Sequence, residues 1–376
     1  MTTIATETPG TTATERSISA SLLQVPQYTR PAAEKAALLL EGLNRLTTHH
    51  VAASPIYARV MRALFPGAPA PVGTLAEVPF LPVGLFKSHR LQSIADADIT
   101  TVLTSSGTSG QTPSRIVLDA ATASRQRAAL ASIMGTLLGP RRLPMLVLDS
   151  PAIVRARGAL SARGAGVLGM MTFGGAHAFA FREDLTFDAD AVHAFLAGHG
   201  QAPFLMFGFT FLAWQALVEQ AATGTFDMQH GILIHSGGWK ALQDRAVDDA
   251  VFKARLGVHT GLTRIHNFYG MIEQVGGVFL EGDDGLLYPP DFADVLIRDP
   301  LTFDVLPHGE AGVIQVVSLL PESYPGHSIL TEDRGVIVHE DAPGAMRRGK
   351  GFRVLGRVPR AELRGCSDVI ATIQSS

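Results

Sequence analysis

Cysteine is almost absent from this chain of 376 residues, which contains a single one, Cys366. One cysteine excludes an internal disulfide and is typical of a reducing compartment such as the cytoplasm. A strong charge of either sign is also absent, because the formal net charge is −3 and the one basic run is short, Arg347–Lys350. We therefore expect no nucleic-acid partner, since nucleic acids are bound through basic surfaces.

Long apolar runs are missing as well. The most hydrophobic window, Ala202–Val218, is interrupted by Pro203, Gly208 and Gln215, and it is too short to cross a membrane. The first residues lack the basic and apolar pattern of a secretory signal. With 46% hydrophobic and 17% charged residues, the chain can build one large core or two smaller ones. The composition predicts a soluble cytoplasmic protein that acts on small molecules.

Strand-like and helix-like patterns alternate through the middle of the chain. Continuous apolar runs at Pro144–Asp149, Pro203–Phe207 and Gly231–His235 are typical of buried parallel strands. Helices are predicted over Ala33–Leu46, Ile56–Leu64, Ala120–Leu138, Asp190–Ala197 and Leu212–Ala221. This alternation predicts an α/β architecture with a largely parallel sheet.

The two ends of the chain have a different character. Residues 1–17 are rich in threonine and are expected to form a disordered tail. Val78–Lys87 contains several prolines and is predicted to be a surface-covering loop or an edge segment. Beyond Asp284, we expect a small antiparallel or barrel-like subregion. Its strands are predicted at Val295–Ile297, Gly312–Leu319, Gly335–His339 and Phe352–Leu355.

A loop rich in hydroxyls and glycines lies between two apolar segments, Ile99–Leu103 and Arg115–Leu118. Glycine lets backbone N–H groups approach an anion closely, and hydroxyl groups add further donors. The loop therefore predicts a phosphate site, although a flexible Gly/Ser linker is the alternative. It lacks the Gly-Lys-Ser/Thr ending of a Walker loop. The candidate ligands are Thr104, Ser105, Ser106, Gly107, Thr108, Ser109 and Gly110.

The pattern Thr-Ser-Ser-Gly-Thr-Ser-Gly-x-x-Pro resembles the phosphate loop of the adenylate-forming superfamily, which includes acyl- and aryl-CoA ligases. A second segment, Tyr269-Gly270-Met271-Ile272-Glu273, is similar to the Tyr-Gly-x-Thr-Glu motif of these enzymes. The resemblance implies that Tyr269 and Gly270 bind the adenine of ATP and that Glu273 binds Mg²⁺, which prefers hard oxygen ligands. Ile272 departs from the motif, because the superfamily usually has a hydroxyl there.

Two further segments resemble superfamily motifs in the expected order. Ser236–Lys240 follows a buried strand, where parallel sheets bind their ligands, and the resemblance implies that Gly237 and Gly238 border the adenine. Thr331–Gly335 is similar to a Thr-Gly-Asp-x-Gly motif. By this resemblance Asp333 accepts both ribose hydroxyls, a strong and directional contact for a carboxylate.

The C-terminal segment, residues 356–376, resembles a shortened hinge. Arg357 belongs to the Gly-Arg pair that opens the hinge of full-length ligases, and we expect their mobile C-terminal domain to be absent. This shortening and the ending Arg364–Ser367 resemble the acyl-protein synthetases of the luminescence fatty-acid reductase complex, the LuxE family. A Phe-Lys pair before the phosphate loop, here Phe86-Lys87, also recurs in that family. The resemblance implies that Cys366 takes the acyl group from the adenylate.

Two histidines and one aromatic segment complete the candidates. His235 and His266 lie beside the motif strands and are interpreted as residues that line the carboxylate pocket or act as a base; a structural role is equally open. Phe204–Phe211 is predicted to contribute to an apolar acyl or aryl pocket, with core packing as the alternative.

The resemblance as a whole implies an adenylating domain over residues 18–355 that uses ATP and Mg²⁺. It would activate a fatty or aromatic carboxylic acid to acyl-AMP, transfer the acyl group to Cys366 and pass it to a partner thiol on a reductase or carrier protein. One alternative is a CoA ligase or carrier-protein acylating enzyme in which Cys366 has no role. Another is a non-catalytic subunit that binds a nucleotide or an acyl group.

Overall fold

The computed structural model describes residues 22–23, 26–105, 113–155, 160–239 and 245–358. Its helices are α2 (Ala32–Ala53), α3 (Pro55–Leu64), α4 (Leu85–Ser88), α5 (Ala120–Leu138), α6 (Ala152–Arg155), α7 (Ala162–Met171), α8 (Ala189–His199), α9 (Thr210–Trp214) and α10 (Asp249–Thr260). The short helical turns are η1 (Leu75–Glu77), η2 (Asp96–Asp98), η5 (Ile272–Gln274) and the π-helix η3 (Gln215–Gln220).

The strands alternate with these helices in the first two thirds of the chain and follow one another afterwards. They are β1 (Leu81–Pro82), β2 (Thr101–Thr104), β3 (Arg115–Leu118), β4 (Leu143–Leu148), β5 (Leu160–Ser161), β6 (Gly174–Phe179), β7 (Phe204–Phe209), β8 (Gly231–Ser236), β9 (Arg264–Gly270), β10 (Val278–Glu281), β11 (Leu287–Tyr288), β12 (Ala293–Arg298), β13 (Ala311–Ser318), β14 (Ser328–Glu340) and β15 (Lys350–Arg357).

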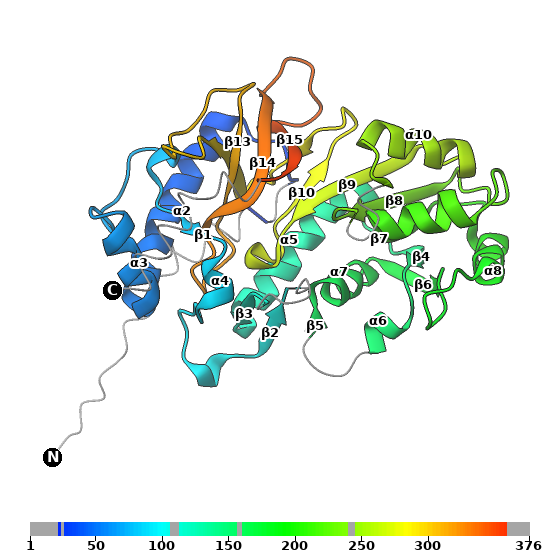
Figure 1. Ribbon diagram of the computed structural model, residues 1–376, viewed down its shortest axis with the longest axis horizontal. Coiled ribbons are helices and arrows are strands. Elements are labelled where there is room, and N and C mark those ends of the chain that lie inside the picture. Colours follow the sequence, from blue (N-terminus) through cyan, green and yellow to red (C-terminus); the bar gives the residue numbers. More distant parts are fainter. Residues whose placement is uncertain (1–21, 24–25, 106–112, 156–159, 240–244, 359–376) are drawn as a thin grey trace.

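One large sheet crosses the molecule in the order β12-β13-β14-β15-β11-β10-β9-β8-β7-β4-β6 (Figure 1). The strands from β6 to β9 are parallel, as predicted for an α/β protein. From β9 onward the neighbours are antiparallel, because the turn after Gly270 sends β10 back along β9. The expected antiparallel subregion is therefore present. It continues the same sheet.

Helices cover both faces of the parallel strands. Leu205 and Phe207 of β7 belong to a core cluster with α5 and α7, whereas Phe204 and Met206 belong to one with α8 and α10. This alternation follows from the two-residue period of a strand. It explains why β7 is apolar at successive positions, as expected for a strand buried on both faces.

The proline-containing segment before the predicted phosphate loop is an edge segment, one of its two predicted forms, but it is buried and does not form a surface-covering loop. β1 pairs in parallel with β14 through Leu81 and Pro82, and the Val83 N–H donates to the Leu330 carbonyl at 2.9 Å. Pairing at the side of the sheet is compatible with proline, as predicted. The segment is buried because Val78, Leu81 and its neighbours contribute to the main core.

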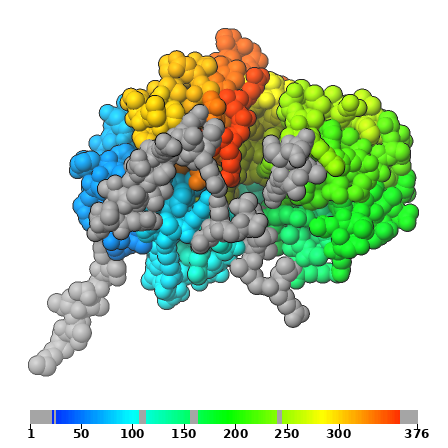
Figure 2. Space-filling view, viewed as in Figure 1, coloured from blue at the N-terminus to red at the C-terminus, as the bar shows by residue number. Residues whose placement is uncertain are grey.

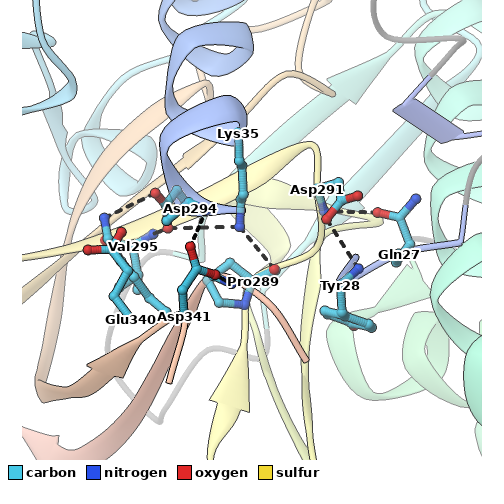
Figure 3. Close-up of polar contacts among 12 residues, drawn as sticks. Gln27, Tyr28, Lys35, Pro289, Asp291, Asp294, Val295, Glu340 and Asp341 are labelled. Carbon is cyan, nitrogen blue, oxygen red and sulfur yellow. Dashed lines mark hydrogen bonds and ion pairs between the residues drawn. The ribbon is translucent and has the colours of Figure 1, made fainter. Parts of the chain in front are cut away.

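A buried polar network attaches α2 to the antiparallel strands (Figure 3). Lys35 Nζ donates to the Pro289 carbonyl at 3.0 Å and lies 3.9 Å from Asp294 Oδ1. Lys350 Nζ lies 3.0 Å from Asp294 Oδ2. Burial lowers the pKa of Lys35, whereas the two lysines hold the pKa of Asp294 down against the effect of its own burial. The network fixes the N-terminal helix on β12 and β15.

Figure 2 shows the orange and red strands β14 and β15 between the blue N-terminal helices and the green central segments. Within the described ranges, no helix has both the length and the apolar composition needed to cross a bilayer.

Candidate active site

The two strands beside the predicted phosphate loop form an antiparallel pair, β2 and β3, in which Thr104 lies opposite Arg115. The Ser105 N–H donates to the Ser114 carbonyl at 3.0 Å, and the Ser114 N–H donates to Ser105 Oγ at 2.8 Å. These bonds hold together Ser105 and Ser114, the two ends of the loop. The rest of the predicted ligands, Ser106, Gly107, Thr108, Ser109 and Gly110, lie outside the described residues.

Three motif residues that are far apart in the sequence meet where β9, β14 and β15 approach one another. Tyr269 Oη donates a hydrogen bond to Asp333 Oδ2 at 2.8 Å. Arg357 lies opposite Asp333 in the β14–β15 pair, with its Nε 3.8 Å from Asp333 Oδ1. The fold thus brings together the residue predicted to bind the adenine, the residue predicted to bind the ribose and the arginine that opens the predicted hinge.

The Tyr269 ring is held by aromatic neighbours. Its centroid lies 6.0 Å from that of Phe279 and 6.3 Å from that of Phe352, and the second pair is edge-on. Burial and the Asp333 carboxylate raise the pKa of Tyr269, so its hydroxyl keeps its proton and acts as a donor. Burial also raises the pKa of Asp333, although the Tyr269 hydroxyl and the Arg357 guanidinium oppose this effect.

Glu273 lies on the turn η5 between β9 and β10 and is 6% exposed. Burial raises the pKa of Glu273, while the Ser114 hydroxyl and the Lys87 ammonium lower it. Its neighbour Gln274 donates to the carbonyls of Val316 and Gly326 at 3.2 and 2.9 Å, which fixes the turn. The turn therefore holds Glu273 in a fixed, buried position.

The Gly-Gly loop after β8 is fastened by a threonine that no motif predicted. Thr210 Oγ1 donates to the Gly237 carbonyl at 2.6 Å. Gly237 has φ of +80°, and a side chain there would come within 3.1 Å of the Phe209 ring. Around Gly238, no atom of the described residues comes within 4 Å of an added Cβ. The loop can therefore present its backbone closely to a flat ligand.

The two candidate histidines are buried on neighbouring strands. The His235 Nδ1 lies 3.0 Å from Thr210 Oγ1, and its ring centroid is 4.6 Å from that of Phe252 on α10. Burial lowers the pKa of His235 to about 3, and it also lowers the pKa of His266. Both rings are neutral at physiological pH. The contacts of His235 are those of a core residue that supports Thr210, and a catalytic role for either histidine stays a prediction.

A family model, acyl-protein synthetase, LuxE, matches residues 69–374 of the chain. The chain belongs to the LuxE family. A curated relative, the long-chain-fatty-acid–luciferin-component ligase of Vibrio harveyi, is 27% identical over 138 residues. That match spans 36% of this chain and 35% of the relative's length.

Solved structures share the fold of this LuxE-family chain. A 2-hydroxyisobutyryl-CoA ligase in an open conformation, solved with 2-HIB-AMP and CoA, has a TM-score of 0.61 and 19% identity over 89% of this chain and 77% of that one. The same ligase in a postadenylation state with R3-HIB-AMP has a TM-score of 0.62 and 17% identity over 88% and 69% of the two chains. The α/β fold is thus that of the N-terminal domains of adenylate-forming enzymes, as predicted.

Sequence reasoning missed two residues that lie beside the candidate site, Thr210 and Glu332. Thr210 lies at the start of an apolar helix and carries no signal of its own. Glu332 stands where the related motif has glycine, and this departure was the available signal. Its carboxylate lies 3.4 Å from Arg357 NH1 and 3.6 Å from Lys87 Nζ. Glu332 therefore adds a second negative charge beside Asp333.

The chemistry of Glu273 fits a magnesium ion. Burial penalises the charge of this carboxylate, and a bound cation would offset that penalty. Mg²⁺ commonly takes one or two carboxylates and completes its shell with waters and substrate phosphates. Consistent with such a sparse protein contribution, the part of the chain that the structure describes holds no cluster of three or more histidine, cysteine, aspartate or glutamate side chains suited to a metal.

Proposed function

We propose that this LuxE-family protein activates a carboxylic acid with ATP. The acid's carboxylate attacks the α-phosphorus, so that acyl-AMP forms and pyrophosphate leaves. The observation that carries the proposal is the hydrogen bond between Tyr269 and Asp333, which joins two motif residues 64 positions apart in the sequence. An aromatic ring and a charged acceptor placed together suit the base and the ribose of one nucleotide.

The motif residues divide the binding of ATP among them in this proposal. The Tyr269 ring and the Gly237-Gly238 loop bind the adenine, and Asp333 accepts hydrogen bonds from the ribose hydroxyls. Thr104 and Ser105 begin the loop that surrounds the phosphates. Glu273 would hold Mg²⁺, which supplies charge neutralisation when bound. Transfer at phosphorus depends mainly on such positioning and neutralisation.

The acyl group lies, in this proposal, against the aromatic residues at the ends of β7 and β9. The Phe207 ring is stacked on Phe268, with centroids 6.3 Å apart, and is 6.1 Å from Phe209. These side chains belong to the apolar face that α7 covers. Such a surface suits a fatty chain or an aromatic ring, and the name of the Vibrio harveyi relative favours a long-chain fatty acid.

The second step of the proposal uses Cys366, which lies outside the described residues. Its thiolate attacks the carbonyl carbon of acyl-AMP. The bond between that carbon and the phosphate oxygen breaks, and AMP leaves. The thioester then passes its acyl group to a thiol on a partner protein. This relay needs a free thiol and therefore a reducing compartment such as the cytoplasm. Splitting the transfer into two displacements is typical of covalent catalysis.

Intact-protein mass spectrometry tests the proposal. The protein is incubated with MgATP and a pool of fatty and aromatic acids, with a Cys366→Ser variant alongside. We expect a hydroxylamine-labile adduct on the wild type alone, whose mass identifies the acid. AMP release without an adduct would contradict the cysteine relay and favour CoA or a carrier protein as the direct acceptor. Neither adduct nor AMP with any acid would favour a non-catalytic binding subunit.

A further inference from the structure

A lysine to which no motif assigns a role lies beside the carboxylates of the site. Lys87, on α4, has its Nζ 3.6 Å from Glu332 Oε2, and its side chain is 30% exposed. Its positive charge also lowers the pKa of Glu273 against the effect of burial. One ammonium group therefore lies beside the strand that carries Asp333, and its charge also acts on the proposed magnesium ligand.

The backbone around Lys87 is firmly placed. The preceding strand β1 pairs with β14 at Ile329 and Leu330, immediately before the Thr331-Glu332-Asp333 motif. Phe86, the residue before Lys87, is 1% exposed and packs edge-on against Tyr324, with ring centroids 6.3 Å apart. The partly exposed lysine side chain extends from this fixed backbone. It can exchange one anion for another without a change in the fold.

The other lysines that the structure describes are engaged elsewhere. Lys35 and Lys350 bind Asp294, and Lys253 binds Glu281 and Asp249. Near Lys87, in contrast, the carboxylates of Glu332 and Asp333 follow one another on β14, and Arg357, which pairs with both, is 77% exposed. A triphosphate bound beside these carboxylates would be repelled by them unless a cation neutralised it. Lys87 could do so by leaving Glu332.

We propose that Lys87 binds the β- and γ-phosphates of ATP and the pyrophosphate that leaves, moving from Glu332 to the phosphate oxygens. The inference rests on the proposed function and names a further catalytic residue for it. Its geometric basis is that Lys87 Nζ lies 3.6 Å from Glu332, the residue before Asp333 on β14, and that β1, which precedes Lys87, pairs with the start of β14. An ammonium group at this place neutralises the charge that develops on the leaving group.

Binding and exchange measurements on Lys87→Ala and Lys87→Arg test the proposal. By calorimetry, we expect Lys87→Ala to lose roughly 10- to 100-fold in affinity for ATP and pyrophosphate, as for a lost charged hydrogen bond. AMP lacks the two outer phosphates, so its affinity should change less than twofold. The kcat/KM of ATP–pyrophosphate exchange should fall in parallel with the ATP affinity, and Lys87→Arg should restore part of both.

Two further variants separate a phosphate role from a structural one. Arg90→Ala removes an exposed cation three residues along, paired with Asp96 at 2.7 Å, and should leave all affinities unchanged. Glu332→Gln frees Lys87 from its carboxylate and should leave ATP affinity equal or tighter. If Lys87 only holds Glu332 in place, Glu332→Gln and Lys87→Ala would share one defect, and the proposal would fail.

The outcomes also separate this inference from the proposed function. Exchange activity that is equal in wild type and Lys87→Ala would overturn the role of Lys87 and leave acid activation standing. Lys87-dependent binding of ATP and pyrophosphate, without exchange for any acid, would support the role of Lys87 and contradict acid activation. An equal loss of AMP and ATP affinity in Lys87→Ala would show a distorted site and overturn the inference.

Discussion

At the scale of single residues, Tyr269 has two separable parts. Its ring packs against Phe279 and Phe352, and its hydroxyl donates to Asp333. The hydroxyl is the donor that keeps a half-buried carboxylate satisfied, since Arg357 is 3.8 Å away and mostly in solvent. In the proposed function the ring binds the base, while the hydroxyl orients the carboxylate that binds the ribose.

Tyr269→Phe should therefore separate orientation from stacking. Removing the hydroxyl deletes one hydrogen bond to a charged acceptor, and we expect the KM for ATP to rise by about 5- to 10-fold, or about 1 kcal/mol, with little change in kcat. Tyr269→Ala also removes the ring and should raise the KM further, because base–aromatic stacking contributes about 1–3 kcal/mol. ATP–pyrophosphate exchange at varied ATP measures both. Equal KM values in the two variants would contradict a role for the ring.

At the scale of elements, the turn after β9 carries Glu273 and is fixed by a close approach to α5. Gly276 has φ of +84°, and a Cβ there would lie 2.8 Å from the backbone of Gln126. The same turn approaches Gly326, where a Cβ would lie 2.6 Å from the Glu273 carbonyl. The position of the Glu273 carboxylate thus depends on two contacts in which no side chain fits.

Gly276→Ala should destabilise the protein by about 2 kcal/mol, because the new methyl group meets backbone atoms and φ is strained. A matched control is Gly135→Ala on α5, where an added Cβ has nothing within 4 Å. That variant should be neutral or stabilising by about 0.5–1 kcal/mol, since alanine favours a helix. Urea unfolding compares the two. A Gly276→Ala protein as stable as wild type would show that the turn can shift away from α5.

At the scale of the whole molecule, the sequence predicted the parallel half of the sheet best. β4, β7 and β8 are continuous apolar runs, which burial on both faces requires. β9 was not predicted as a strand, because the polar residues His266, Asn267 and Tyr269 interrupt its apolar pattern at the candidate site. The first half of β14 was missed for the same reason, since Thr331, Glu332 and Asp333 are polar.

The candidate site was predictable as a set of motifs but not as a set of contacts. The order of the motifs indicated one nucleotide site, and Tyr269, Asp333 and Arg357 do meet. The pair Lys87 and Glu332 was out of reach, because it depends on a two-residue pairing between β1 and β14 across about 250 residues of sequence. No local pattern encodes such a contact. It follows from the packing of the whole core.

The same long-range packing places two histidines in the core between α2 and the segment before β14. His50 and His327 are both fully buried, with stacked rings whose centroids are 4.9 Å apart. His327 Nε2 lies 3.0 Å from Thr47 Oγ1 on α2, and His50 Nδ1 lies 2.7 Å from Ser93 Oγ. Burial lowers the pKa of His327 to about 3 and places that of His50 well below its usual value. Both imidazole rings are neutral in the folded protein at neutral pH.

Because the pKa of His327 is depressed in the folded state, the unfolded chain binds a proton that the folded chain does not. Stability should be fully present above pH 6.5 and fall as the pH decreases from 6.5 toward 3, by at most about 1.4 kcal/mol per pH unit for each such histidine. His327→Phe keeps a ring beside His50 but cannot titrate. It should be less stable at pH 7.5, because the bond to Thr47 is lost, and should lose less stability between pH 6.5 and 4.5. Urea unfolding of the wild type and of His327→Phe at several pH values measures this slope. An unchanged slope in His327→Phe would assign the acid sensitivity to other buried groups, among them His235.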